Sequence, residues 1–173
     1  AALSMEPLPR IVETGIRRRA FWAVVAAVFV ADLASKWLAF ALCGDPPQAV
    51  WVWEGYFSIS PSYNRGAAFS ILHDMDSGRM VLIAINAALL GMLVQMARQP
   101  SFAPAWFGIA CIIGGASANL HDRVLLGHVR DFLRMGWWPT FNVADVALCV
   151  GVGLLLVHLA RPVPQVSHSN RES

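Results

Sequence analysis

Two aspartates, Asp131 and Asp145, lie at the two ends of a short polar stretch that joins one long apolar run to the next. Ionisable residues are costly at the edge of a bilayer, so they indicate a functional site there. Two carboxylates that lie close together share one proton, and such a pair can hydrolyse a peptide bond. The ionised carboxylate activates water while the protonated one polarises the carbonyl. The spacing alone leaves open whether these two side chains meet.

Each aspartate also has a simpler explanation. Asp145 follows Asn142 by three residues at the start of an apolar run, which is the pattern of a helix N-cap with an acid in the first turn. Asp131 lies in a segment of mixed polarity, where it can be a solvated loop acid that pairs with Arg130 or Arg134. The residues alone leave these alternatives open. For Asp145 the two readings are compatible, because a helix start fixes the carboxylate and favours its ionised form.

Three further polar residues, Asn119, Asp122 and Arg123, end the third apolar run. A cation at the C-terminus of a helix complements the helix dipole, and the adjacent Asp122 is a candidate ion partner for Arg123. Asn119 can satisfy backbone groups at the same helix end. These residues are expected to be structural unless the fold places them in a cleft.

Asp32 and Lys36 are charged residues inside the first apolar run, four positions apart on one helical face. Each costs about 2.5–3.5 kcal/mol near the centre of a membrane helix. Pairing between them offsets part of this cost. We therefore expect the pair to face inward and to support a polar site rather than to take part in catalysis.

The composition is that of a membrane protein: 57% of the residues are hydrophobic, 14% are charged, and the mean hydropathy is +0.53. Soluble domains carry about 25% charged residues. A net charge of +2, without a basic run interleaved with aromatics, argues against nucleic acid as a partner. Cys43, Cys111 and Cys149 have no disulfide or zinc spacing and are expected to be small buried hydrophobes. The five histidines are scattered, and the lack of a His-Glu-x-x-His motif disfavours metal-dependent proteolysis. We expect neither a metal nor a cofactor.

Four apolar runs predict an α-helical integral membrane protein, a single membrane domain over residues 1–173 with four transmembrane helices. The first run follows a basic cluster, as in a signal peptide. It is longer than a signal core of about 7–15 residues and contains charges, so we expect it to be retained. The helices are expected at residues 20–43, 80–97, 103–120 and 143–160, between polar tails at 1–19 and 161–173.

Residues 44–78 are expected to form a small β-structured cap outside the membrane. Pro46-Pro47 breaks the first helix, and residues 51–60 alternate partly with the period of a strand, which Pro61 is expected to end. The sequence Asn64-Arg65-Gly66 predicts a turn.

The arginines predict the orientation, because basic connections stay on the cytoplasmic side. The bias is strongest at the first helix. One side carries Arg10, Arg17, Arg18, Arg19, Arg98, Arg161 and Arg171, and the other carries Arg65, Arg79, Arg123, Arg130 and Arg134. Both termini are therefore expected in the cytoplasm. The cap and a catalytic loop at 121–142 are expected at the outer, periplasmic face.

Five sequence blocks, over roughly residues 20–160, together resemble the lipoprotein signal peptidase family (signal peptidase II). Each block alone is weak, but five in order with a matching hydropathy pattern are specific. The blocks are Asp32-Leu-Ala-Ser-Lys36, Asn64-Arg-Gly-Ala-Ala-Phe69, Gly114-Gly115 with Asn119-Leu-His-Asp122-Arg123, Val129-Arg-Asp131-Phe132, and Phe141-Asn142-Val-Ala-Asp145.

The resemblance implies an aspartyl endopeptidase of the bacterial inner membrane with a small periplasmic β-cradle. It would remove signal peptides from prolipoproteins, cutting N-terminal to a cysteine that already carries diacylglycerol. Its partners would be this lipidated substrate and membrane lipids, and the peptide antibiotic globomycin would inhibit it. The matching positions imply Asp131 and Asp145 as the catalytic pair; Asn64, Asn119, Arg123 and Asn142 as substrate-binding residues; and Asp32, Lys36, Gly66 and Asp122 as structural support.

A small membrane transporter or scaffold without catalytic activity is the alternative function. Such a protein would thread acids and bases through several helices to form an ion path. Here the helix interiors are apolar apart from Asp32 and Lys36, and the other charges gather toward one outer face. This distribution favours the protease.

Overall fold

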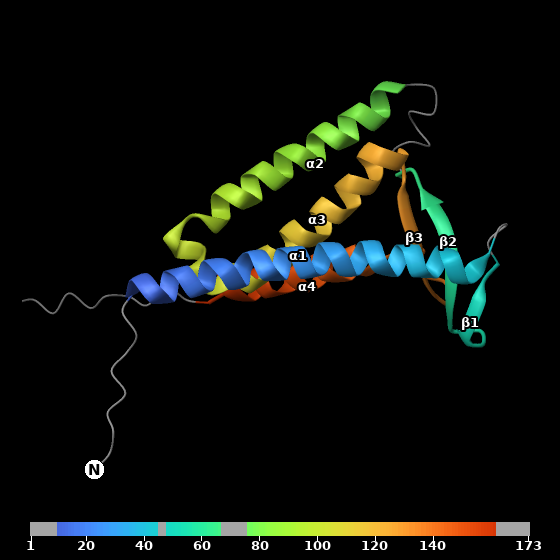
Figure 1. Ribbon diagram of the computed structural model, residues 1–173, viewed down its shortest axis with the longest axis horizontal. Coiled ribbons are helices and arrows are strands. Elements are labelled where there is room, and N and C mark those ends of the chain that lie inside the picture. Colours follow the sequence, from blue (N-terminus) through green and yellow to red (C-terminus); the bar gives the residue numbers. More distant parts are fainter. Residues whose placement is uncertain (1–9, 45–47, 67–75, 162–173) are drawn as a thin grey trace, which may run out of the picture.

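The computed structural model describes residues 10–44, 48–66 and 76–161. Within these residues, four α-helices run back and forth along the long axis, and a small sheet lies at one end (Figure 1). In chain order the elements are α1 (Arg10–Cys43), β1 (Val50–Trp53), β2 (Phe57–Asn64), α2 (Asp76–Ala97), the 3₁₀ helix η2 (Pro100–Ala105), α3 (Trp106–Leu126), β3 (Val129–Met135) and α4 (Val143–Leu159). Helix α1 begins and helix α4 ends at the end away from the sheet (Figure 1). Residues 1–9 and 162–173 of the predicted tails lie outside the described residues. So do Ala67, Ala68 and Phe69, which end the sequence block that begins at Asn64.

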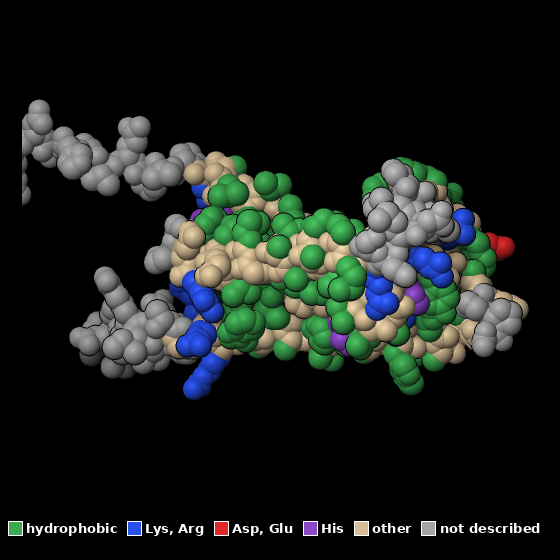
Figure 2. All heavy atoms as spheres, turned by 90° about the horizontal axis from the view of Figure 1, so that it is seen from above, with side chains coloured by type: hydrophobic (Ala, Val, Ile, Leu, Met, Phe, Trp, Pro, Cys, Tyr) green, Lys and Arg blue, Asp and Glu red, His purple; other side chains and the backbone are tan. Residues whose placement is uncertain are grey.

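Among the described residues, three helical segments are long and apolar enough to cross a membrane: Arg17–Cys43, Gly78–Ala97 and Phe102–Leu126. The fourth, Val143–Leu159, is apolar but has 17 residues. At 1.5 Å per residue it rises about 26 Å, slightly less than a hydrocarbon core of about 30 Å. The fourth span therefore stays a prediction. Hydrophobic side chains cover the middle of the molecule in Figure 2, and Lys and Arg side chains lie toward its two ends.

Helix α3 packs closely against both α1 and α4 because glycines face the two contacts. A Cβ on Gly114 would lie 2.8 Å from the Cβ of Val28 in α1, and a Cβ on Gly115 would lie 2.6 Å from the carbonyl oxygen of Ala144 in α4. Small residues let membrane helices approach in this way. The close approach brings the polar end of α3 next to Lys36 of α1 and the start of α4.

The third helical segment differs in detail from the predicted residues 103–120. Residues 100–105 form η2 with Pro104 inside it, and the α-helix begins at Trp106 rather than at 103. It continues past 120 to Leu126, where Gly127 adopts a left-handed conformation (φ 79°) and its N–H donates to the Arg123 carbonyl. The polar residues after 120 had suggested a loop, but the helix continues, and the buried Asp122 within it is paired with Lys36 and Arg130.

The stretch 121–142 is not a plain loop, since 129–135 forms strand β3. The three strands are antiparallel in the order β1-β2-β3. Pro61 does not end the strand predicted before it, because β2 continues to Asn64. The β2–β3 register shifts between Ile59 and Ser62, where a proline cannot donate to the ladder. The expected cap is thus a three-stranded sheet that includes the segment carrying Asp131.

Two other boundaries differ from the prediction. Helix α1 begins at Arg10, inside the expected tail 1–19, and α2 begins at Asp76, inside the expected cap 44–78. Cys43 and Cys111 are buried as expected, but Cys149 is exposed on the outer surface of α4.

Candidate active site

The side chain of Asn142 connects the two aspartates. Its Nδ2 donates to Asp131 Oδ1 at 2.7 Å, and its Oδ1 accepts from the backbone N–H of Asp145 at 2.9 Å. In return, Asp145 Oδ2 accepts from the backbone N–H of Asn142 at 3.1 Å. Asn142 is fully buried, so this geometry is fixed by the fold. The two carboxylates whose proximity the sequence left open are held by one residue.

Asp131 reaches Asn142 because β3 pairs with β2. Ser62 is opposite Asp131 and Asn64 is opposite Val129 in the antiparallel register. From this position Asn64 Nδ2 donates to Asp131 Oδ2 at 3.0 Å. Each carboxylate oxygen of Asp131 therefore accepts from a different asparagine. The predicted alternative, in which Asp131 pairs with a neighbouring arginine, is wrong.

The proton affinity of Asp131 is raised. The side chain is 1% exposed, and this burial raises its pKa from 3.8 to about 6. The hydrogen bond from Asn64 lowers the pKa, the nearby charge of Asp145 raises it, and the hydrogen bond from Asn142 lowers it. Burial outweighs the two donors, so Asp131 can hold a proton at a pH where an ordinary aspartate cannot.

Asp145 lies in the first turn of α4, where the predicted cap is confirmed. Asn142 and Asp145 form a capping box in which each side chain accepts from the backbone N–H of the other. Asn119 Nδ2 donates to the second oxygen, Oδ1, at 2.9 Å. The positive end of the α4 dipole also favours a negative charge at this position. Asp145 is therefore held by both of its oxygens at the positive end of α4.

Lys36 of α1 binds the side chain of Asn119, which in turn contacts Asp145. Its ammonium forms ion pairs with Asp32 Oδ2 at 2.6 Å and Asp122 Oδ2 at 3.1 Å, and it donates a hydrogen bond to Asn119 Oδ1 at 3.2 Å. The predicted Asp32–Lys36 pair is confirmed, and both side chains are fully buried. Asp32 also accepts from the backbone N–H of Ala144 at 2.8 Å, so it caps α4 as well. The pair links α1, α3 and α4 under the two aspartates.

The partner of Asp122 differs from the expected one. The carboxylate accepts from Arg130 of β3, at 2.8 Å from Nη2 and 3.3 Å from Nε, and also from the Arg130 backbone N–H at 3.1 Å. It does not use the neighbouring Arg123, because adjacent helical residues point in different directions. Asp122 thus fixes the start of β3 to α3 and thereby helps to position Asp131, the residue after Arg130.

Arg123 instead lines a cleft of about 330 Å³ together with Asn119 and Asp145. Its Nη1 lies 3.4 Å from the carbonyl oxygen of Asn119. Most of the wall is apolar and comes from α2, α3 and α4: Leu89, Met92, Leu93, Ile112, Ala116 and Leu148, with Asn86 on α2. The cleft therefore combines a mostly apolar wall with the polar side chains of Asn119, Arg123 and Asp145.

The predicted turn after β2 has a local cause. The Asn64 Oδ1 accepts from the backbone N–H of Gly66 at 2.8 Å, and Gly66 has a φ of 94°, which favours glycine. The turn orients the Asn64 amide so that its nitrogen points to Asp131. Gly66 therefore supports the site through Asn64.

Three contributing residues were missed or assigned another role: Arg130, Arg79 and Asn86. Arg79 of α2 donates to the carbonyl oxygens of Arg123 (3.2 Å) and Val124 (2.7 Å) and so holds α2 to the end of α3. An arginine directly before an apolar run was the signal that could have revealed Arg79. Arg130 was considered as a partner of Asp131 and as an orientation signal, but not as the partner of Asp122.

The fold and the site define a membrane protein with a buried acid and an ionisable partner at one end of its helices. The signal peptidase II family model matches residues 24–161. The chain is 42% identical over 151 residues to a lipoprotein signal peptidase of Geobacter sulfurreducens, covering 83% of this chain and 92% of the relative. It is 39% identical over 148 residues to a lipoprotein signal peptidase of Aeromonas hydrophila, covering 80% and 86%.

A solved structure of a bacterial membrane enzyme superposes with a TM-score of 0.69 at 26% identity, covering 83% of this chain and 94% of that one. The chain belongs to the signal peptidase II family.

Proposed function

We propose that this chain is an aspartic endopeptidase that removes signal peptides from lipoproteins, with Asp131 and Asp145 as its catalytic pair. The observation that carries the proposal is the connection of both carboxylates through Asn142, at 2.7 Å to one side chain and by a mutual cap to the other. Membership of the signal peptidase II family supplies the reaction. The family membership also removes the transporter or scaffold as an alternative.

The two environments give the two acids different roles. Asp145, at the positive end of α4 and in contact with the cleft, is the ionised base that takes a proton from water. Asp131, whose buried carboxyl has a raised pKa, donates its proton to the oxygen of the scissile carbonyl. When the tetrahedral intermediate collapses, the C–N bond breaks and the amine leaves with the proton held by Asp145. Asp131 then recovers a proton from the hydroxyl that becomes part of the new carboxylic acid.

The substrate is a prolipoprotein whose cysteine carries diacylglycerol, and the cut lies on the N-terminal side of that cysteine. The cleft supports this choice because its walls are mostly apolar while its end holds Asn119, Arg123 and Asp145. A lipidated cysteine keeps its acyl chains in the bilayer, so its peptide bond stays at one depth. Holding the bond there supplies the positioning that a carboxylate pair needs. Four polar side chains bind the substrate backbone or hold the two catalytic aspartates in place: Asn64, Asn119, Arg123 and Asn142. Globomycin competes with the substrate for the same cleft.

The membrane arrangement has four spans, both termini in the cytoplasm and the active site at the periplasmic face of the inner membrane. The beginning of α1 and the end of α4 lie together, away from the sheet (Figure 1). Arg17, Arg18 and Arg19 lie at that end, and the excess of arginines on the cytoplasmic side sets orientation.

Cleavage of a defined substrate tests the proposal. Membranes containing the full chain are incubated with a prolipoprotein that has a diacylglyceryl cysteine, or with the same protein without the lipid. The masses of the products are measured by mass spectrometry. We expect one cut, immediately before the cysteine, only in the lipidated protein, and inhibition by globomycin. Equal cleavage of the unlipidated protein would contradict the substrate assignment, and a cut elsewhere would contradict the position of the bond.

A further inference from the structure

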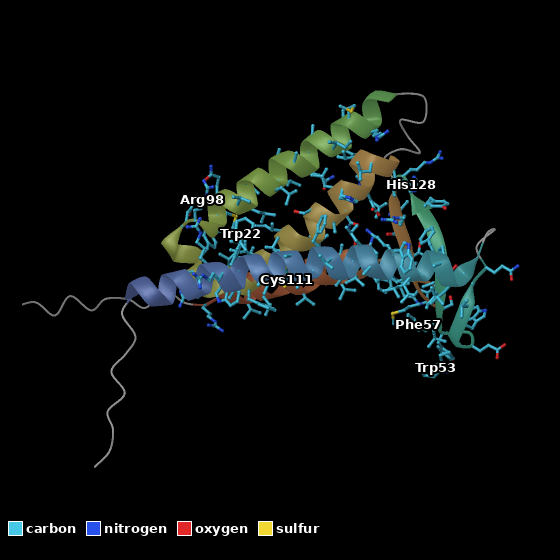
Figure 3. All side chains as sticks on the ribbon, viewed as in Figure 1. Trp22, Trp53, Phe57, Arg98, Cys111 and His128 are labelled. Atoms are coloured by element: carbon cyan, nitrogen blue, oxygen red, sulfur yellow. The ribbon has the colours of Figure 1, made fainter. Side chains whose placement is uncertain are left out.

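A second cavity lies at the end of the molecule away from the sheet. Its volume is about 630 Å³, within the usual range for small organic ligands. The beginning of α1, the end of α2 and the beginning of the α3 segment surround it, with Arg17, Arg18, Phe21, Trp22, Val94, Ala97, Arg98, Ala103 and Trp106 as its lining. Figure 3 shows Trp22 and Arg98 at this end, far along the helices from His128 beside the sheet. None of these residues belongs to the candidate active site.

The charge of the cavity has one sign. Arginines from two helices, Arg17 and Arg18 of α1 and Arg98 directly after α2, line it, and none of its described lining residues is acidic. Within the described part of the chain, the guanidinium groups of Arg18 and Arg98 have no carboxylate partner. Guanidinium groups bind phosphate through several parallel hydrogen bonds. The cavity therefore favours an anion, with phosphate as the best-matched group.

The remaining walls are apolar and aromatic. Phe21 and Trp22 come from α1, Val94 and Ala97 from α2, and Trp106 from α3. A free phosphate ion would use the arginines and leave these walls in contact with water. A phosphate that carries acyl chains would use both parts of the cavity.

The depth of the cavity in the membrane also fits a lipid. Arg17 begins the first membrane-spanning segment, Ala97 ends the second and Phe102 begins the third, so the cavity lies where three spans meet one membrane surface. Lipid phosphates occupy this level, and tryptophan is enriched there. Basic pockets between membrane helices bind anionic lipid headgroups.

We propose that this cavity binds one anionic phospholipid, such as phosphatidylglycerol, with its phosphate on Arg18 and Arg98 and its acyl chains against Phe21, Trp22 and Trp106. The bound lipid joins α1 to the end of α2, two helices that diverge toward the sheet (Figure 1). The site goes beyond the proposed peptidase activity and does not depend on it.

Native mass spectrometry of the purified full chain in detergent tests the proposal. The protein is titrated with phosphatidylglycerol or with phosphatidylcholine of the same acyl chains. The test variant is Arg18→Gln/Arg98→Gln. The matched control is Arg19→Gln/Arg161→Gln, which removes the same charge near the same end but from residues that do not line the cavity. The single variant Arg98→Gln, outside the helix, serves if the double variant does not fold.

We expect the wild type and the control to retain phosphatidylglycerol in preference to phosphatidylcholine. The test variant should bind phosphatidylglycerol about tenfold to thirtyfold more weakly, since each arginine near an anionic lipid contributes a several-fold effect, and Arg98→Gln alone should lose a smaller part. Millimolar inorganic phosphate should not displace the lipid. Equal binding of both lipids, equal losses in test and control variants, or full displacement by phosphate would each overturn the proposal.

Discussion

Substitution of Asn142 separates its two roles. Serine at this position keeps an oxygen that caps the backbone N–H of Asp145, but it has no amide to donate to Asp131 at 2.7 Å. Alanine loses both interactions. The helix cap is worth about 0.5–2 kcal/mol, so Asn142→Ala should unfold that much more easily than Asn142→Ser. Both variants release Asp131 from its tie to the start of α4.

The loss of activity should be similar in the two variants, because both lose the tie between the carboxylates. A displacement of a reacting group by about 1 Å costs roughly 100-fold in rate, and we expect a decrease of that order in kcat/KM. The remaining activity should also respond differently to pH. Asp131 must be protonated, so kcat/KM of the wild type should fall as pH rises through its pKa of about 6. The donor from Asn142 lowers this pKa, so its removal should move the alkaline limb to higher pH.

The assay is cleavage of a lipidated prolipoprotein by purified protein in nanodiscs between pH 4.5 and 8.5, with thermal unfolding measured on the same samples. If cleavage by Asn142→Ser were close to that of the wild type and only the less stable Asn142→Ala were impaired, the role of the Asn142–Asp131 hydrogen bond in catalysis would be refuted. An alkaline limb that moves to lower pH in Asn142→Ser would refute the assignment of the proton to Asp131.

Three further predictions concern the support of the site. Lys36→Met should destabilise the protein by about 3–5 kcal/mol, measured by thermal unfolding, because it leaves buried aspartates without their shared cation. Gly115→Ala should cost about 1–3 kcal/mol and lower cleavage, since its Cβ would lie 2.6 Å from the Ala144 carbonyl oxygen, whereas Gly153→Ala, with nothing within 4 Å, should be neutral. Because the pKa of Asp131 is about 6 folded against 3.8 ordinarily, its contribution to stability should be complete below pH 3.8 and disappear as pH rises through 6. At 1.36 kcal/mol per pKa unit this loss is about 3 kcal/mol, and a pH series of unfolding should show it in the wild type but not in Asp131→Asn.

The sequence was sufficient for site contacts between residues that lie close together in the chain. Asn142 and Asp145 are three positions apart at a helix start, and Asp32 and Lys36 are four apart within a helix, so local geometry determines each pair. The structure confirms both contacts. Asp131 was predicted as the partner of Asp145 from the order of the five sequence blocks. No local rule of helix or strand geometry connects these two residues.

Contacts between distant segments could not be predicted in the same way. Strand β3 forms because Val129–Met135 pairs with β2 more than sixty residues earlier in the chain, and a strand with Arg130 and Asp131 inside it has weak alternation. The choice of Arg130 over Arg123 as the partner of Asp122 depends on that pairing. The extension of α3 to Leu126 likewise depends on partners that fold beside it. Taken alone, the polar residues after 120 predict a loop. In the structure they belong to α3, where Asp122 is paired with Lys36 and Arg130.

The most direct test of the central claim compares Asp131→Asn, Asp145→Asn and Glu54→Gln under single-turnover conditions, with globomycin binding measured on each protein. Glu54 is an exposed acid in the β1–β2 turn and serves as the control. The catalytic pair predicts no detectable cleavage by either aspartate variant, full cleavage by Glu54→Gln, and a folded protein that still binds the antibiotic in all three. Substantial cleavage by Asp131→Asn or by Asp145→Asn would contradict the claim that the two carboxylates act together.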